Sequence, residues 1–544
     1  MAHPARQLGA LSAALLLCGT ALAEQAPADR WSVTAHGSYR VVGWNQSNLE
    51  LGADGTGSAV EKLGQTTFFA HRLRLGGEAK VRHLTFELEF DALDGLLNAQ
   101  GGQVMRPVPA PEGGGAPPRL ADPIRNQSYG LTLNSFALRK LSVQWLSKVG
   151  VFGLGAMPSN FGLGMLANGG DAPLDASLGD QEFGDRVVRA FYATQPLRAF
   201  GIHEHLDLAI GADLVLQDAL GTLVRPSYEW ANDGVWADKG VEGLIYLRHE
   251  RGNYSSELYV TRRTEWVPDG AGLDPDVTAA FTSGLNVWAF DAAVRYHHPL
   301  GDPKAQRELF GAAEAAYVTG TTNEVRNLAC PGSSSANECG VSQGGGVFEG
   351  GYRSRKVTAQ LTLGYASGDG NPFDGTQTGF HFNRDFKAGL ILFDQVLGWQ
   401  SAAAVRRISD PNMVNVPPAG IGLYSTDGAI TDAFFVEPSV HYRPLEHLEL
   451  VGNVLWAVAP QPYVDPYWMT RTSATTNAFG MAAGRDYGVE LDLGVNWRLP
   501  LPHGLTWLVG AAGGYFLPGD AFVVSKGSTM PDVYLVKART ALEF

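Results

Sequence analysis

Residues 355–374 read RKVTAQLTLGYASGDGNPFD, and this stretch decides the fold that the sequence predicts. From Lys356 to Tyr365, polar and apolar side chains alternate at every position. Because successive side chains of a β-strand point to opposite faces, this strand has one apolar and one polar face. It ends in Gly368–Pro372, a run of turn-forming residues. Repeated around a closed cylinder, such strands predict a barrel with lipid outside and water inside.

The overall composition fits such a barrel better than a helical membrane protein. The chain has 544 residues, 18% of them charged, and a mean hydropathy of -0.07. Past the N-terminus it has no run of 18 or more apolar residues, which a membrane-spanning helix requires. A closed barrel is the other structure that satisfies all backbone hydrogen bonds in lipid. The net charge of -14 excludes a nucleic-acid binder, because phosphate contacts need clustered Lys and Arg.

The N-terminus is typical of a secretory signal peptide. The basic residue Arg6 precedes the apolar run Leu8–Leu17, and Ala21-Leu22-Ala23 is a suitable cleavage site. We therefore expect residues 1–23 to be removed and residues 24–544 to form a single barrel domain. In an exported chain the two remaining cysteines, Cys330 and Cys339, are expected to form a disulfide.

The remaining sequence predicts an all-β fold, a transmembrane antiparallel up-and-down barrel of about 18 strands. An even number of strands places both termini on the periplasmic side, with short turns there and long loops outside. A short strand is expected at Val347–Arg353. Tryptophans near predicted strand ends suggest aromatic girdles at the two membrane interfaces. These are Trp44, Trp288, Trp456, Trp468, Trp497 and Trp507.

Long loops are expected near 96–127, 158–185 and 368–432. The last one has apolar content of its own, at Leu390–Phe393, and a helix-forming segment at Ser401–Arg407. Such a loop either folds into the mouth of the barrel as a plug or stays outside it.

The inward strand faces carry charges of both signs. Glu87, Glu89 and Asp91 share one face of a strand and cannot lie in lipid, and Arg72 and Arg74 of the neighbouring strand could pair with them. Lumen charges of this kind either set selectivity or pair with one another and stiffen the wall. The residues predicted to line the pore are Arg72, Arg74, Glu87, Glu89, Asp91, Arg295, Lys356, Glu437, Arg443, Glu490, Asp492, Arg498 and Arg539.

The sequence contains no signature of catalysis. A nucleophile elbow, a zinc-binding HExxH pair and a phosphate-binding glycine pattern are all missing from it, so we expect neither an enzyme nor a cofactor. Asp369, Asn371 and Asp374 could place oxygens around a calcium ion. The same residue types also form ordinary turns.

The last strand ends on Phe544, with apolar residues at every second position before it. This end resembles the signal that delivers outer-membrane barrels to their assembly machinery. Together with the signal peptide, it predicts the outer membrane of a Gram-negative bacterium, with lipid and lipopolysaccharide around the barrel. We expect the barrel to be a monomer.

The segment Leu363–Asp369, LGYASGD, resembles the alginate-export family of porin-like outer-membrane barrels. In that family the following external loop carries a Phe-Asp pair, similar to Phe393-Asp394 here, and an early strand is similar to Arg72-Leu73-Arg74. The resemblance implies an 18-stranded barrel that exports an acidic polysaccharide through an arginine-rich constriction. This sequence departs from the family in having Gln395-Val396-Leu397 in place of a tyrosine-proline continuation.

Two functions follow from these observations. The first is a channel that passes a hydrophilic solute, including export of an anionic polysaccharide of the alginate type. The second is a plugged structural or adhesive barrel whose outer loops bind a partner.

Overall fold

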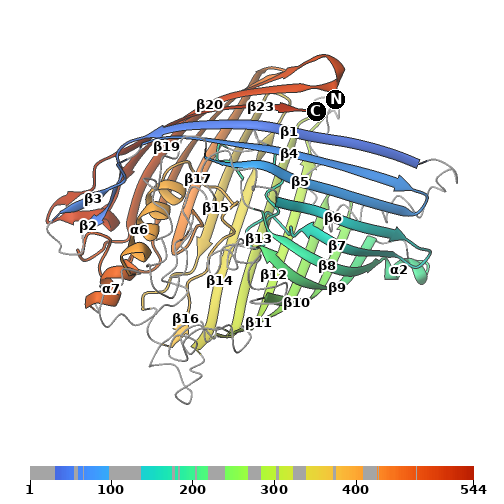
Figure 1. Ribbon diagram of the computed structural model, residues 1–544, viewed down its shortest axis with the longest axis horizontal. Helices are drawn as coiled ribbons and strands as arrows, with labels where there is room; N and C mark the ends of the chain where they lie inside the picture. The colour runs from blue at the N-terminus through green and yellow to red at the C-terminus, as the bar shows by residue number, and fades with distance from the viewer. Residues whose placement is uncertain are drawn as a thin grey trace.

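The computed structural model describes residues 31–53, 59–64, 66–96, 137–173, 178–181, 184–202, 205–217, 239–266, 284–301, 306–322, 339–371, 375–408, 426, 428–472 and 475–544. Within these residues, eighteen long strands form a closed antiparallel barrel (Figure 1). In chain order they are β1 (Trp31–Gln46), β4 (Thr67–Val81), β5 (Leu84–Leu96), β6 (Ala137–Leu146), β7 (Val151–Pro158), β8 (Arg186–Thr194), β9 (His205–Gln217), β10 (Lys239–Arg251), β11 (Tyr254–Trp266), β12 (Gly284–Pro299), β13 (Glu308–Thr322), β14 (Cys339–Arg353), β15 (Val357–Ala366), β17 (Ala433–Leu445), β18 (Leu448–Val458), β19 (Asp486–Pro500), β20 (Thr506–Pro518) and β23 (Val533–Glu543).

Each barrel strand pairs with its neighbours in the chain, and the first strand closes the barrel against the last. Arg40 of β1 is opposite Arg72 of β4 on one side and Ala541 of β23 on the other. No barrel strand among the described residues is left with a free edge along its whole length. The predicted all-β, antiparallel, up-and-down barrel of about 18 strands is therefore confirmed.

Trp31 and Phe544 lie at the same end of the barrel, which we call the terminal end; the opposite end is the loop end. Connections at the terminal end are short, such as Arg82-His83 between β4 and β5 and Gly252-Asn253 between β10 and β11. Several long connections at the loop end, including 97–136 and 218–238, lie outside the described residues.

The outer surface of the barrel is apolar. On β19, Leu491 and Leu493 point outward, and Leu493 is 73% exposed. Comparable side chains repeat around the barrel, as at Phe86 and Leu88 of β5 and Val536 of β23. A contiguous apolar surface of this extent is typical of contact with lipid or a partner. No helix in the described ranges has the length and apolar character needed to cross a membrane.

Four of the predicted girdle tryptophans lie on this outer surface, and two do not. Trp288, Trp456, Trp497 and Trp507 are exposed on outward faces. Trp44 instead points inward and stacks on Phe68, with ring centroids 5.4 Å apart. Trp468 lies on a helix between β18 and β19. The prediction was wrong at these two positions because proximity to a strand end does not determine which face a side chain occupies.

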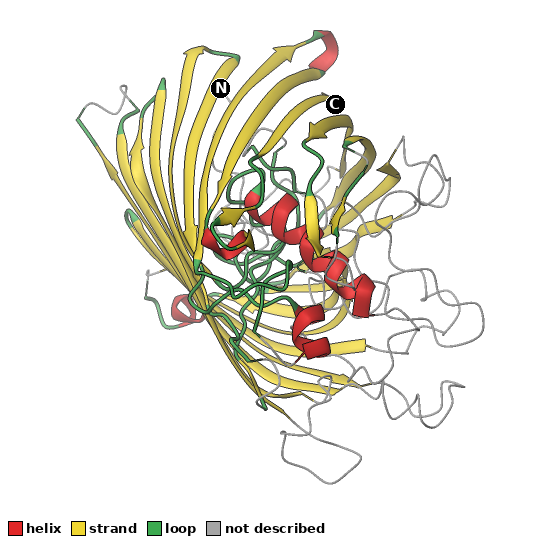
Figure 2. Cartoon of the chain, turned by 90° about the vertical axis from the view of Figure 1, so that its left-hand side faces the viewer, coloured by secondary structure: helices red, strands yellow, loops and turns green. Residues whose placement is uncertain are grey.

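We call the segment between β15 and β17 loop 367–432, and its described residues pack against the inner wall of the barrel. Figure 2 shows helices and loops enclosed by the curved sheet. Phe393 and Trp399 of this loop belong to one buried apolar core with Phe435 of β17 and Leu455 of β18. The smaller elements are β2 (Glu50–Ala53), β3 (Val60–Lys62), α2 (Pro196–Ala199), β16 (Thr376–Gln377), η2 (Leu392–Leu397), α6 (Gly398–Ile408), α7 (Pro466–Thr472), η4 (Pro502–Gly504), η5 (Asp520–Phe522), β21 (Val523–Ser525) and β22 (Ser528–Thr529).

Candidate functional site

One side of the lumen carries a cluster of basic side chains, which we call the basic wall. It is formed by β23, β1, β4 and β6. Its members are Arg40, Arg72, Arg74, Arg139, Lys140, Lys537 and Arg539. Arg139 and Lys140 are consecutive yet both contact inward carboxylates, because the pairing of β5 with β6 shifts register at Glu89. A β-bulge re-aims side chains in this way.

The basic wall pairs with carboxylates of β5. The Arg74 guanidinium binds Asp91 through two contacts, Nε to Oδ1 at 2.7 Å and Nη2 to Oδ2 at 3.0 Å. Arg139 lies 3.3 Å from Glu89 and 3.8 Å from Asp91. Bidentate ion pairs such as Arg74–Asp91 are geometrically specific and stiffen the wall. The sequence-based pairing of Arg74 with this strand is confirmed.

Loop 159–185, between β7 and β8, lies across the basic wall. Asp171 is 2.8 Å from Arg139 and 3.3 Å from Arg74. Asp180 is 2.5 Å from Lys537 and 3.2 Å from Arg539. Burial by itself would raise the pKa of Asp180, but the two basic groups outweigh it and hold that pKa below its usual range. This loop is therefore held to the wall by charge.

The inserted loops are also held by carboxylates of the barrel wall that accept backbone N–H groups. Glu314 of β13 accepts from Leu163, from Met165 at 3.1 Å and from Leu166 at 3.3 Å. Successive backbone N–H groups that converge on one anion form a nest. Loop 159–185 therefore spans the lumen, from β13 to the basic wall.

Glu490 of β19 holds loop 367–432 in the same manner. It accepts from Leu390, from Ile391 at 2.7 Å and from Leu392 at 2.8 Å. We call the contacts at Glu314 and Glu490 the two amide anchors.

Each amide anchor has a neighbouring glycine with a positive φ: Gly162 (φ 54) beside Glu314 and Gly389 (φ 65) beside Glu490. A Cβ at Gly389 would lie 2.8 Å from the Glu490 carboxylate, and one at Gly162 would collide with Glu314. Glycine therefore provides both the backbone conformation and the space for the carboxylate.

The two inserted loops also bind each other. The Asn383 N–H donates to the Met165 carbonyl at 2.6 Å, and its side-chain amide donates to Asp185 at 2.7 Å. The Gly184 N–H donates to Asp385 at 2.6 Å. The loops form one connected body across the lumen.

The other predicted pore residues lie at several levels of the wall. Glu87 accepts a hydrogen bond from Ser142 at 3.2 Å, and Arg295 pairs with Glu257 at 2.8 Å. Glu437 accepts from the Gly389 N–H at 3.1 Å. Asp492 is 1% exposed and lies beside the Glu490 carboxylate.

Three predicted pore residues lie near the terminal end. Arg443 pairs with Glu449 at 2.6 Å, and Arg498 pairs with Glu543 at 3.0 Å. Lys356 lies in the turn between β14 and β15 and is exposed.

Of the residues predicted to bind calcium, Asp369 and Asn371 lie in a turn. Asp369 accepts hydrogen bonds from the backbone N–H groups of Asn371 at 3.0 Å and Thr378 at 3.1 Å, and Asp374 lies outside the described residues. Nowhere in the described residues do three or more His, Cys, Asp or Glu side chains gather so as to hold a metal. Cys339 is buried at the start of β14, but Cys330 is not described, so their pairing stays a prediction.

Sequence reasoning missed several members of the site. Arg40 follows the inward alternation of β1 and was detectable by the same rule that identified Arg72 and Arg74. Arg139 depends on a bulge, and Asp171 and Asp180 lie in a loop, where no periodicity indicates a direction.

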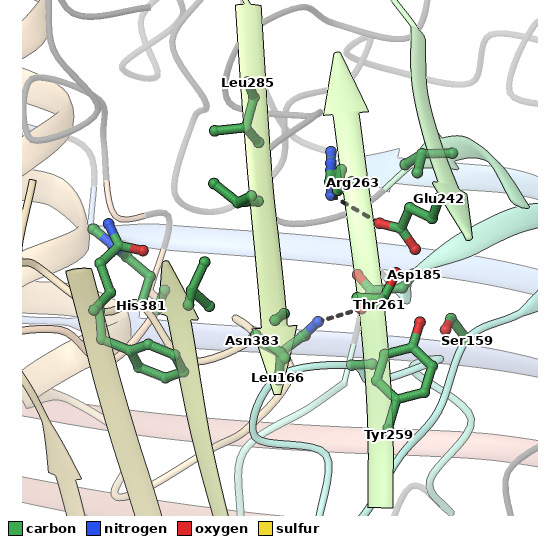
Figure 3. A pocket seen from close by; sticks show the side chains of 18 of the residues that line it. Ser159, Leu166, Asp185, Glu242, Tyr259, Thr261, Arg263, Leu285, His381 and Asn383 are labelled. Carbon is green, nitrogen blue, oxygen red and sulfur yellow. Dashed lines mark hydrogen bonds and ion pairs between the residues drawn. The ribbon is translucent and has the colours of Figure 1, made fainter. Parts of the chain in front are cut away.

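A cavity of about 150 Å³ lies beside this body of loops. It is bounded by strands β8 to β14 and by residues of both loops, including Leu166 and Asn383 (Figure 3).

No family model and no curated protein matches the sequence, so the resemblance to the alginate-export family is not supported. Among solved structures, the chain is similar to OccAB1 of Acinetobacter baumannii, with TM-score 0.48, 11% identity, and coverage of 96% of this chain and 99% of that one. It is also similar to OccK9 (OpdG) of Pseudomonas aeruginosa, with TM-score 0.46, 11% identity, and coverage of 94% and 98%. For the outer membrane protein OprD of the same organism, the TM-score is 0.44, the identity 10%, and the coverage 94% and 92%. These values assign neither a family nor a solute.

Proposed function

We propose that the chain is a channel in the outer membrane of a Gram-negative bacterium that passes a small hydrophilic solute. The observation that carries this proposal is the division between the two faces of the barrel. Apolar side chains such as Leu493 face outward, whereas charged side chains such as Arg74 and Glu490 face inward. Such a division is stable only with lipid outside and polar surroundings inside.

The charge of the lumen favours an anionic group on the solute. Among the described residues, the seven side chains of the basic wall lie beside five carboxylates, which leaves a formal surplus of two positive charges in this group. The five are Glu87, Glu89, Asp91, Asp171 and Asp180. Loops 159–185 and 367–432 both lie in the lumen, which favours a small solute over a polysaccharide of the alginate type.

One observation favours the plugged barrel as the second candidate. The apolar core that joins loop 367–432 to the wall includes the fully buried Trp399, Phe393 and Phe435. A core of this kind is a stable packing arrangement, and a barrel closed by it would leave the outer loops to bind a partner.

Planar-bilayer recording of the purified protein separates these candidates. We expect discrete conductance steps and, in a salt gradient, a reversal potential that shows preference for anions. A variant in which residues 379–430 are replaced by a short Gly-Ser linker should conduct more. A barrel that stays silent in both forms, while correctly folded in membranes, would refute the channel and favour the plugged barrel.

Three further features of the proposal concern export and assembly. They are removal of residues 1–23, delivery to the assembly machinery through Phe544, and a Cys330–Cys339 disulfide in a monomeric barrel. Mass spectrometry of the mature protein, with and without reductant, tests the first and the third. Deletion of Phe544 should reduce insertion into the outer membrane.

A further inference from the structure

We propose that the 150 Å³ cavity between the barrel wall and the two inserted loops is a binding subsite for a small uncharged molecule, the size of one aromatic ring with a hydroxyl group. The proposal rests on the channel function, because the subsite would give a passing solute an apolar contact in addition to the charged contacts of the lumen. The subsite would hold the apolar body of a solute that carries both apolar and polar groups.

The barrel wall is apolar at this place. Five strands around the cavity present aliphatic side chains to the interior. They are Val187, Val215, Leu285, Val287, Val318 and Val341. Leu285, Val287 and Val341 form an apolar cluster of their own. These side chains give the cavity an apolar lining for the apolar part of a ligand, whose transfer from water is favourable by about 25 cal/mol per Å² of apolar area.

The size of the cavity limits the ligand. A volume of about 150 Å³ accommodates a ligand the size of benzene. The lining extends over several strands and both loops, with Phe380 and Leu166 on the loop side. A single six-membered ring therefore fits this volume.

Charged side chains also line the cavity, and they have partners within the protein. Arg263 reaches into the cavity but is paired with Glu242 at 3.5 Å and with Glu265. Asp185 accepts from the Asn383 amide at 2.7 Å and from the Asn168 N–H at 3.0 Å. Arg263, Glu242 and Asp185 are therefore engaged with other groups of the protein, and Arg384, which also lines the cavity, is not free either.

His381 adds no charge to the lining. Burial lowers the pKa of its imidazole to about 4, and a hydrogen bond with the Gly379 backbone only partly opposes this, so the ring is neutral near pH 7. A lining whose charges are already paired favours an uncharged ligand, because an ion would lose its hydration without a free counter-charge.

Hydroxyl groups give the cavity a polar edge. Tyr259, Thr261 and Arg263 alternate along β11 and point to the same side, and Ser159 of loop 159–185 lines the same cavity (Figure 3). The Tyr259 ring packs against Phe161, with centroids 5.6 Å apart, which orients the phenol group. These hydroxyl groups can donate to or accept from a hydroxyl on the ligand.

The test uses 4-fluorophenol as the probe, with ¹⁹F NMR of the full-length mature barrel in detergent. We expect a saturable, one-to-one shift of the fluorine resonance that unfluorinated phenol competes away. Ala289→Phe, which fills the cavity from β12, should weaken binding at least tenfold. Ala292→Phe is the matched control, because Ala292 lies on the same strand but faces outward.

Val341→Phe, from β14, provides a second cavity-filling variant should Ala289→Phe fail to fold. Each variant is also recorded in KCl in planar bilayers. Equal effects of Ala289→Phe and Ala292→Phe, or a shift that never saturates, would overturn the subsite, since either outcome indicates partition into detergent. Normal KCl conductance without probe binding refutes the subsite alone, whereas probe binding to a barrel without conductance refutes the channel.

Discussion

Replacing Glu490 with Ala should release loop 367–432 from the barrel wall. The carboxylate accepts three consecutive backbone N–H groups, from Leu390, Ile391 and Leu392. Hydrogen bonds to a charged acceptor contribute about 1.5–3 kcal/mol each. Even the lower value gives about 4.5 kcal/mol for the three, or roughly a two-thousandfold change in the docking equilibrium of the loop.

Two assays report this release. In detergent, loop 367–432 of the Glu490→Ala variant should be cut by a protease under conditions in which the wild-type loop is protected. In planar bilayers the unitary conductance should rise and the current should become noisier. Glu490→Gln keeps an acceptor oxygen but loses the charge, so its effect should be intermediate.

Glu449→Ala is the control, because Glu449 also lies on the inner wall but pairs with Arg443 and His441 near the terminal end. It should leave loop cleavage unchanged. Wild-type cleavage and conductance in the Glu490→Ala variant would refute the idea that this carboxylate holds the loop.

Three further predictions test other parts of the structure. Arg139→Gln removes one ion-pair partner from Glu89 and one from Asp171. It should therefore shift the reversal potential toward cation preference, and it should lower the free energy of unfolding by about 3–5 kcal/mol in urea unfolding in detergent. Leu493→Arg places a charge on the outward face at mid-strand and should cost about 2–4 kcal/mol in lipid; no cost in a liposome unfolding assay would contradict the lipid-facing surface. Burial raises the pKa of Asp465 to about 6, against opposing hydrogen bonds from the backbone, so the folded segment binds a proton more tightly than the unfolded one. The stability of this segment should be greatest below pH 4 and fall by about 3 kcal/mol as the pH rises through 6. Hydrogen exchange of residues 460–472 measures this dependence, and Asp465→Asn should remove it.

The barrel itself could be predicted because alternation is a local property of the sequence. One strand face must be apolar and the other polar, and this is visible at Tyr487–Leu499 and at Tyr534–Leu542 without any knowledge of the neighbours. The alternation rule failed at glycines, which have no side chain to indicate a strand face. β14 begins at Cys339, well before the predicted Val347, because its glycines indicate no face. One of them, Gly345, makes room for the Phe380 ring, which a Cβ would strike.

The arrangement inside the lumen could be predicted only in part. Arg74 and Asp91 pair because their strands are adjacent, and adjacency follows from the order of the chain. Glu490 was predicted to line a pore, but its partners lie about a hundred residues away in a loop whose path no periodic pattern describes. The carboxylate positions were therefore accessible from the sequence, and their partners were not.

The contacts between the two inserted loops have a consequence for current recordings. Because Asn383 and Asp385 connect one loop to Met165, Asp185 and Gly184 of the other, neither loop can swing aside without straining its companion. A channel blocked by two independent flaps would show three current levels, whereas one blocked by a linked pair would switch between two. Replacing both Asn383 and Asp385 with alanine removes the two links made by side chains and should make the intermediate level appear.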